Sequence, residues 1–437
     1  MSVSLVVARP AGGKTDTCIQ EVRNTLAKKP LAQVWVVVPD RLQASAFRRR
    51  LAQTGGALGA HVGSFGDLYK NILERAGMFV PVASSPLLHR LVQESIDLSI
   101  AQGEISHYAA LQRAPGFILT LRDSFAELKR SLIYPDQLAE YTRNGTHAQQ
   151  ELSILYTRYQ NRLRELNWAD PEGLSWLAVE VLKKQANIVS SIQLLAVDGF
   201  DSFTGAQRKT LQLLTTQVNE MLITFPGEMN SRRPAHRRFT TMLATLQQEL
   251  SAQVISLEGQ PHLSPETLHL EQHVFDADEK IFPSKVSPFL IEARSPEEEA
   301  RESLRWIKAR VVRDQISLTE CAIFTPSPDV YNPLLRLAAV EFGIPIRFTQ
   351  SESLNASPAI VAFMNLLALP AQNFKARTLL NMLRSPYFDF GLDHQTVDVL
   401  EKIGRVARIV EGREQWNETW LRPVSYTHLT LPTKRIV

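Results

Sequence analysis

The sequence predicts an α/β fold in which two mononucleotide-type domains follow one another and the first carries an all-helical insertion. Short apolar runs typical of parallel strands alternate with helical patterns in the first part of the chain and again after residue 286. Between them, apolar residues recur with the 3.6-residue period of helices and no strand pattern interrupts them. The expected parts are a first domain at 1–85 and 187–250, the insertion at 86–186, a linker at 251–285 and a second domain at 286–423.

The first predicted strand ends in a glycine-lysine turn. Leu5–Ala8 is a short apolar run, and the residues after the turn have the apolar spacing of a helix. Backbone N–H groups around Gly12 and Gly13 can surround a phosphate because no Cβ intrudes, and the helix N-terminus adds its positive end. Lys14 would then reach the β- and γ-phosphates of ATP, and the Thr15 hydroxyl would bind Mg²⁺.

This turn departs at one position from the phosphate-loop pattern G-x-x-x-x-G-K-[ST], because Ala8 replaces the first glycine. The letters alone are therefore a weak signal, and a glycine-rich turn with a surface lysine is the alternative interpretation. The position of the turn, between a first strand and a first helix, favours the phosphate loop.

The other elements of the first domain follow the same logic. Val34–Val38 is a continuous apolar run, typical of a strand buried on both faces. Further strands are expected up to Ser64–Phe65 and at 192–197 and 221–225, with helices at 15–27, 41–51 and 208–218. Helices of the insertion are expected at 87–101, 115–132, 149–166 and 171–185, the last with Asp170 as its N-cap.

Asp198 directly follows the predicted strand at 192–197. An acid at the carboxyl end of a buried parallel strand is where an α/β nucleotide site places a second Mg²⁺ contact. The alternative is that Asp198 only caps the following turn. Since the glycine-lysine turn and this acid predict each other, we expect both at one edge of one sheet. The predicted ATP-binding residues are Gly12, Gly13, Lys14, Thr15 and Asp198, and Thr15 and Asp198 are the predicted Mg²⁺ ligands.

The second domain is predicted to repeat the alternation. Ser295 and Pro296 begin a helix, so Glu297–Glu299 are expected to stabilise its positive end rather than to take part in catalysis. Strands are expected at 289–293, 321–325 and 345–348, and helices at 296–313, 330–342, 357–369 and 375–383. A further strand is expected in the linker at 268–274, and residues 424–437, which lack any periodic pattern, are expected to be a non-native tail.

Charge and composition limit the class of protein. The 437 residues include 44% hydrophobic ones and carry a net charge of +3, which suits a globular protein and permits a polyanionic partner. Arg48–Arg50 on a predicted helix is expected to be a solvated face. The basic loop 232–238 could contact a phosphate backbone, and a solvated loop is the alternative.

The two cysteines, Cys18 and Cys321, form no metal-binding or disulfide pattern, and no apolar run approaches the roughly 20 residues of a membrane span. The apolar N-terminus lacks the basic region of a signal peptide. We therefore expect a cytoplasmic protein that does not contact a membrane.

Several segments together resemble the superfamily-one helicases of the UvrD type, whose two motor domains are RecA-like. The resemblance is carried by these segments: residues 8–15 (motif I), Val36–Phe47 with its Val-Pro-Asp (motif Ia), Gly63–Leu68 (the next DNA-facing segment), Leu195–Gln207 (motif II), residues 304–326 and Phe342–Ile346. The wording of motif II, Asp-Gly-Phe-Asp-Ser-Phe-Thr, is most similar to the B subunit of the AddAB-type ATP-dependent helicase/nuclease.

The resemblance implies a role on double-strand DNA ends in recombinational repair, together with a partner motor subunit in a heterodimer. It also implies DNA contacts by Arg41, Ser64 and Phe65, the last as a ring on which a base could stack. Proteins of this kind carry a PD-(D/E)xK nuclease domain with a four-cysteine iron–sulfur cluster. This sequence has only two cysteines, too few for such a cluster. We therefore expect the nuclease domain and the cluster in a C-terminal part beyond these residues.

The departures from the helicase pattern point to a weakened motor. Active members have an Asp-Glu pair in motif II, whereas this chain has Asp198-Gly199 and so lacks the carboxylate that would activate the attacking water. We therefore expect a DNA-binding scaffold that can hold ATP and Mg²⁺ but hydrolyses ATP poorly. An active DNA helicase and a P-loop small-molecule kinase are the alternatives.

Overall fold

The computed structural model separates the chain into two compact units, Met1–Pro288 and Phe289–Val437. It describes residues 2–229, 233, 236–257, 263–273, 283, 289–349 and 354–421. The predicted non-native tail at 424–437 and part of the basic loop at 232–238 lie outside the described residues.

The first unit is built on a six-stranded, all-parallel sheet with the order β3-β2-β4-β5-β1-β6. Its strands are β1 (Ser2–Ala8), β2 (Gln33–Val37), β3 (Ala60–Gly63), β4 (Ile192–Val197), β5 (Glu220–Pro226) and β6 (Gln253–Ser256). The first five confirm the strands expected in this domain. β6 falls in the stretch expected to be a linker, and it pairs with β1 as the edge strand.

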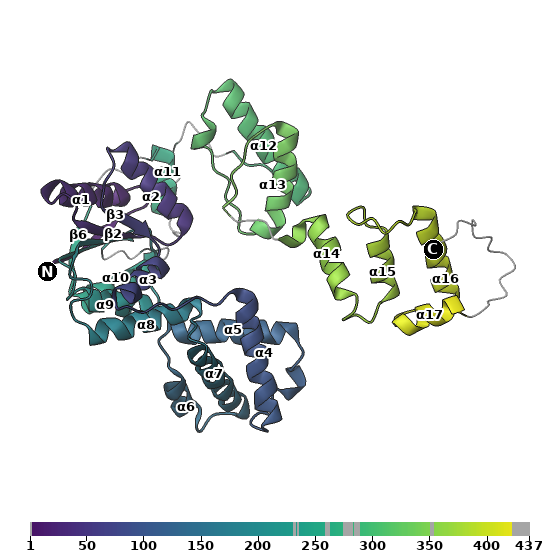
Figure 1. Cartoon of the computed structure of the whole chain (residues 1–437). Coiled ribbons are helices and arrows are strands. Elements are labelled where there is room, and N and C mark those ends of the chain that lie inside the picture. The colour runs from purple at the N-terminus through teal and green to yellow at the C-terminus, as the bar shows by residue number, and fades with distance from the viewer. Residues whose placement is uncertain are drawn as a thin grey trace. The chain divides into compact units, whose positions relative to one another are not determined.

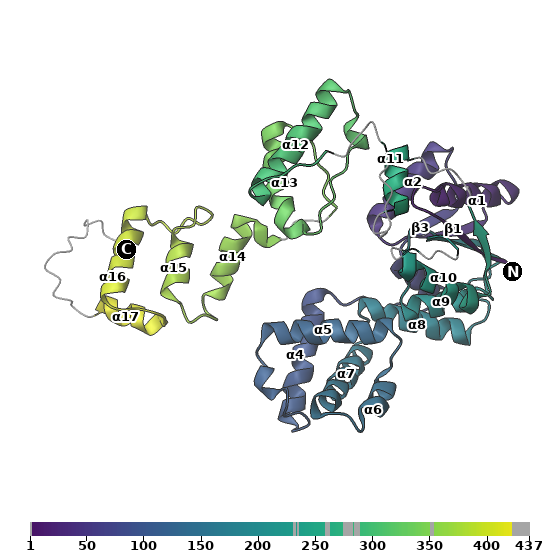
Figure 2. The same ribbon diagram turned by 180° about the vertical axis from the view of Figure 1, so that it is seen from behind.

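Helices cover both faces of this sheet (Figures 1 and 2). One face packs against α1 (Lys14–Lys28) and α2 (Arg41–Gln53). The other face packs against α3 (Phe65–Arg75), α8 (Pro171–Lys184), α9 (Gly205–Leu214) and α10 (Arg237–Leu250). Successive residues of a strand point to opposite faces, so Leu5 and Val7 enter one core while Val6 enters the other. This explains why these strands are apolar at nearly every position.

The insertion forms a helical subdomain with its own core. It holds α4 (Ser85–Ala101), α5 (Pro115–Arg130), α6 (Pro135–Thr142), α7 (His147–Glu165) and a short 3-10 turn at Ala109–Leu111. α6 was not expected. α8 joins the subdomain to the sheet, because Trp176 lies in the helical core while Leu174 and Ala178 lie in the core beside the sheet.

The second unit differs from the prediction. Its helices α12 (Pro296–Arg313), α13 (Pro328–Phe342), α14 (Pro358–Ala368) and α15 (Ala376–Leu383) were expected, and α16 (His394–Val406) and α17 (Arg413–Leu421) were not. The segments expected as strands at 289–293, 321–325 and 345–348 contain no strand in the described part of the unit. A run of apolar residues becomes a strand only where a neighbour completes its ladder of hydrogen bonds, and these segments pair with none.

A second correction concerns the linker. The strand expected at 268–274 is wrong, because Pro265–His273 forms the helix α11 and residue 274 lies outside the described residues. The apolar residues Leu268 and Leu270 are only two positions apart, which misled the strand prediction, whereas Ser264 caps the helix through the backbone N–H of Thr267.

Candidate phosphate-binding site

The site is the loop that joins β1 to α1. The backbone N–H of Gly12 donates to the carbonyl of Arg9 at 3.0 Å, which closes a tight turn. Gly13 has φ +81° and is the N-cap of α1, so it adopts a conformation that L side chains rarely take. A Cβ on Gly12 would lie 2.8 Å from the Cβ of Ala8. Both glycines are therefore required by the geometry of the loop.

Ala8 is the position at which the phosphate-loop pattern fails, and the structure shows how the alanine is accommodated. Its side chain is buried, 3% exposed, and its Cβ fills the space next to Gly12. The loop thus accepts one methyl group at residue 8 because residue 12 has none.

Lys14 begins α1 and folds back over the loop. Its Nζ donates to the carbonyls of Ala8 at 2.9 Å and Arg9 at 2.8 Å. Burial lowers the pKa of Lys14, and the negative charge of Asp198 opposes that shift. Thr15 follows as the second residue of the helix and is half-buried.

Asp198 lies at the same edge of the sheet as the loop. Only β5 separates β4, which Asp198 follows, from β1. The Asp198 backbone N–H donates to the carbonyl of Val37, and its Oδ1 accepts a 2.5 Å hydrogen bond from the Thr224 hydroxyl on β5. The carboxylate is held in place and is only 5% exposed. The parallel sheet thus places the predicted phosphate loop and the predicted Mg²⁺ ligand at the same edge, at the ends of two strands with one strand between them.

Gly199, which follows Asp198 where the resemblance to helicases leads us to expect a glutamate, has a conformation suited to glycine. Its φ is +86°, and a Cβ there would lie 2.5 Å from Gln43 Oε1 and 3.3 Å from Pro39 Cδ. The Gln43 side chain could move aside, but the positive φ would strain any L residue. The local backbone is therefore shaped around the absence of a side chain.

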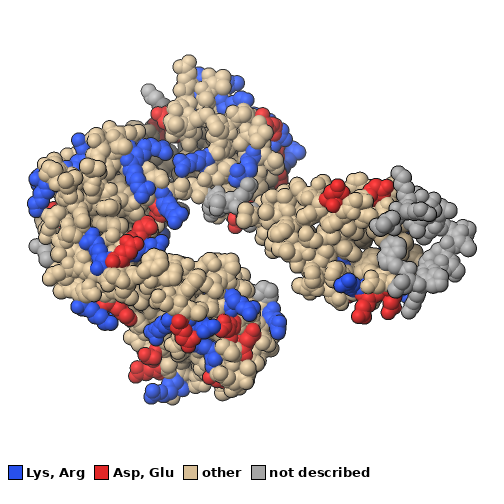
Figure 3. Space-filling model, in the orientation of Figure 1, with Lys and Arg blue, Asp and Glu red and all other residues tan. Residues whose placement is uncertain are grey.

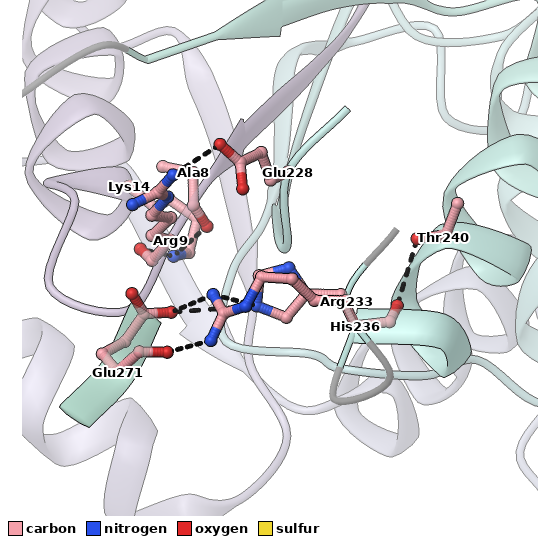
Figure 4. Close-up of polar contacts among 8 residues, drawn as sticks. All are labelled: Ala8, Arg9, Lys14, Glu228, Arg233, His236, Thr240 and Glu271. Carbon is pink, nitrogen blue, oxygen red and sulfur yellow. Dashed lines mark hydrogen bonds and ion pairs between the residues drawn. The ribbon is translucent and has the colours of Figure 1, made fainter. Parts of the chain in front are cut away.

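Charged residues whose pairings the sequence did not predict lie around the loop (Figure 4). Arg9 forms an ion pair with Glu228 at 2.6 Å, on the segment that follows β5. Arg233 pairs with Glu271 of α11 at 3.3 Å, and His236 lies 3.7 Å from the same carboxylate. Burial and the charge of Arg233 lower the pKa of His236. No short motif could have revealed these pairs, since Arg9 and Glu228 are 219 positions apart and Arg233 and Glu271 are 38 positions apart.

The described part of the basic loop is thus directed toward the protein. Arg233 is 17% exposed and His236 is 7% exposed at the side chain. Neither is a freely solvated surface residue, and Arg237 and Arg238 belong to α10.

The three residues expected to contact DNA have different environments. Arg41 is exposed at the start of α2, over which Figure 3 shows a band of basic side chains. Ser64 caps α3 and exchanges hydrogen bonds with Asp67. Phe65 is 5% exposed and packs edge-on against Phe200 and Phe203. In this conformation its ring packs in the core, where it offers no face on which a base could stack.

Comparison with known families decides where this chain belongs. The model of the family described as ADDB, N-terminal, matches residues 5–276, which is more than half of the chain and includes the loop and Asp198. The chain belongs to the ADDB N-terminal family. Within the part of this ADDB-family chain that the structure describes, no helix is both long and apolar enough to cross a membrane.

Relatives of this ADDB-family chain are named as the B subunit of an ATP-dependent helicase/deoxyribonuclease. The protein from Acetivibrio thermocellus is 23% identical, with 92% of this chain and 36% of the relative covered. Those from Caldanaerobacter subterraneus subsp. tengcongensis and Oceanobacillus iheyensis are 21% and 20% identical, covering 98% and 95% of this chain and 38% of each relative. The chain therefore spans little more than a third of the length of these relatives.

Proposed function

We propose that this chain is the helicase-like, DNA-binding part of a helicase/nuclease subunit that acts with a partner motor subunit on double-strand DNA ends in recombinational repair. The observation that carries the proposal is the placement of the glycine-lysine loop and Asp198 at the same edge of one parallel sheet, with only β5 between their strands. Membership of the ADDB N-terminal family and the names of the relatives support the same role.

ATP with Mg²⁺ is the ligand that suits this loop. Gly13 has open space where a side chain would stand, and the N-terminus of α1 favours negative charge. In the proposed complex Lys14 leaves the two carbonyls and binds the phosphates, while Thr15 and Asp198 hold Mg²⁺. The hydrogen bond from Thr224 keeps the Asp198 carboxylate oriented toward the loop edge.

Slow or absent hydrolysis follows from the residue after Asp198. A general base must lie within hydrogen-bonding distance of the attacking water, directly or through one further water. Gly199 has no side chain to offer, so the proposed role of ATP is to stabilise a conformation of the subunit rather than to power strand separation.

DNA is proposed to contact the edge at which β2 and β3 end. Arg41 begins α2 after β2, and Ser64 caps α3 after β3, so both lie at the same edge of the sheet as the loop. Arg49 is exposed further along α2. We propose that the first unit serves as the first RecA-like domain and the second unit as the beginning of the next.

A titration of labelled ATP with Mg²⁺ against the wild-type chain and Lys14→Ala tests the nucleotide site. ATP binding by the wild type that is lost in the variant supports the nucleotide site. Equal and negligible affinity in both would show that the loop has only a structural role. DNA-stimulated hydrolysis that Lys14→Ala abolishes would instead indicate an active helicase. A strict requirement for a small phosphate acceptor, without DNA affinity, would indicate a kinase.

DNA binding is tested by its dependence on salt. Contacts to phosphates release counterions, so affinity for a blunt or single-stranded end should fall steeply between about 50 and 200 mM salt. Replacing Arg41 and Arg49 together by alanine should weaken binding and reduce that slope. Arg90→Ala, which removes an exposed arginine from α4, is the matched control and should change neither.

A further inference from the structure

Arg9 places a second cation at the phosphate loop. It is the first residue after β1, and its carbonyl accepts hydrogen bonds both from Gly12 and from Lys14. Its guanidinium Nη2 lies 2.6 Å from Glu228 Oε1, and the two side chains are 32% and 37% exposed. Figure 4 shows Arg9, Lys14 and Glu228 side by side at the loop.

Glu228 is fixed next to the loop by its backbone. It follows β5, the strand between the phosphate loop and Asp198, and the N–H of the preceding Gly227 donates to the Ala8 carbonyl at 3.1 Å. The glutamate therefore stands at the entrance to the proposed site and holds Arg9 there. Glu271 of α11 adds a second carboxylate whose charge acts on Arg9.

Both cations of the loop are bound to acceptors of the protein itself. Lys14 donates to two loop carbonyls, and Arg9 donates to Glu228. An incoming polyphosphate must replace these acceptors, and Glu228 also repels it. A phosphate matches the planar fork of a guanidinium at least as well as a carboxylate does and carries more charge.

We infer that Arg9 is a second phosphate-binding residue and that Glu228 acts as a latch, holding Arg9 until the phosphates of a nucleotide displace it. This inference rests on the proposed nucleotide site and adds a means of control to it. The alternative is that the ion pair only tethers the loop to the end of β5. Removing the Glu228 charge should raise ATP affinity if Glu228 is a latch, and should leave it unchanged or lower it if the ion pair is only a tether.

The test is the affinity of the full chain for labelled ATP with Mg²⁺ in single and double variants. Glu228→Gln should bind ATP more tightly by roughly two- to fivefold, because a partly exposed ion pair no longer competes. Arg9→Ala should bind roughly tenfold more weakly, because a charge-assisted contact to phosphate is lost. In the Arg9→Ala background, Glu228→Gln should raise ATP affinity less than it does in the wild type, because only the repulsion between Glu228 and the phosphates is then removed.

Arg208 and Glu249 provide a matched control. They form an ion pair at 2.9 Å with side chains 30% and 37% exposed, on α9 and α10. Glu249→Gln should leave ATP affinity unchanged. The thermal midpoint of each variant, read in the same preparation, shows whether a change in affinity accompanies a loss of folding.

Each outcome decides a different point. If the wild type binds ATP through Lys14 and Glu228→Gln binds equally or more weakly, the latch is overturned and the nucleotide site stands. If neither the wild type nor Glu228→Gln binds ATP, both proposals fail. If only Glu228→Gln binds, the latch is supported in its strongest form.

Discussion

The Thr224 hydroxyl donates a 2.5 Å hydrogen bond to Asp198 Oδ1 and so links β5 to the end of β4, at the same edge of the sheet as the glycine-lysine loop. Thr224 is 1% exposed and Asp198 is 5% exposed, so water does not replace this contact easily. A buried carboxylate oriented by a neighbouring hydroxyl is typical of a preorganised metal ligand.

Asp198→Asn should remove the Mg²⁺-dependent share of ATP affinity, and Thr224→Val should reduce that share by roughly tenfold because the carboxylate loses its orienting partner. The measurement is ATP affinity with Mg²⁺ and with a chelator. Thr210→Val is the control, since its buried hydroxyl donates to the Ala206 carbonyl within α9. Equal Mg²⁺ dependence in the wild type and Asp198→Asn would remove the aspartate from the site.

Gly199→Glu should not restore ATP hydrolysis, although it restores the Asp-Glu pair of active helicases. Gly199 has φ +86°, so a side chain there costs about 1 kcal/mol or more and shifts the turn that would aim the new carboxylate. Steady-state phosphate release with and without DNA, together with chemical unfolding, measures both effects. Hydrolysis at the rate of an active motor, in an equally stable variant, would contradict the prediction.

Lys129→Met should strongly destabilise the helical subdomain. Lys129 is fully buried and its Nζ lies 2.6 Å from Asp170 Oδ2, which also accepts from the Tyr159 hydroxyl. Removing the lysine leaves a buried carboxylate without its cation, at a cost of about 3–5 kcal/mol. Urea unfolding measures the change.

The neighbouring Arg130 gives the comparison for that experiment. Its ion pair with Glu172 is at a similar distance, 2.7 Å, but the arginine is 46% exposed. Arg130→Gln should therefore cost less than about 1 kcal/mol. A Lys129→Met variant that is no less stable than Arg130→Gln would show that the buried pair contributes little.

The stability of the helical subdomain should fall at acid pH because of Glu151. Burial tends to raise the pKa of this carboxyl, but the backbone N–H groups of His107, Ser106 and Tyr108 together lower it. A pKa lower in the folded state means that the stabilisation is complete above the ordinary glutamate value of 4.5 and is lost as pH falls from there toward the folded value.

Glu151→Gln should therefore lower the free energy of unfolding by about 2 kcal/mol at pH 7 and by much less near pH 3. Unfolding in urea at several pH values measures this. The exposed Glu165, at the end of the same helix, is the control through Glu165→Gln. A difference between wild type and Glu151→Gln that is the same at both pH values would contradict the assignment.

The first domain was predictable because its signals are local. The runs at 5–8, 34–38, 192–197 and 221–225 are apolar enough to be buried on both faces, and each became a strand of the parallel sheet. Helix starts such as Asp170-Pro171 and Ser295-Pro296 follow capping rules that act within a few residues. β6 was missed because it is short and largely exposed.

The second domain was predicted less well because its strands depend on partners. The run at 321–325 has strand-forming residues, yet Phe324 is 92% exposed and the segment pairs with no neighbour in the described part of the unit. Strand propensity describes a fit to a pleated, half-buried surface, and it is not realised without one. Phe65 is a case where a local motif did not reveal the tertiary environment. The resemblance to helicases placed its segment at the DNA, whereas in the structure its ring is buried in the core.

By itself, the sequence determined the loop: two glycines, a lysine and a threonine between an apolar run and a helix, with an aspartate far along the chain at the end of another apolar run. Local sterics and hydrogen bonding fix such features, so they can be read from neighbouring residues. Only the tertiary structure decided that β5 lies between the two strand ends, that Thr224 orients Asp198 and that Glu228 holds Arg9. Those contacts join residues 26 and 219 positions apart, and the order of strands in the sheet brings them together.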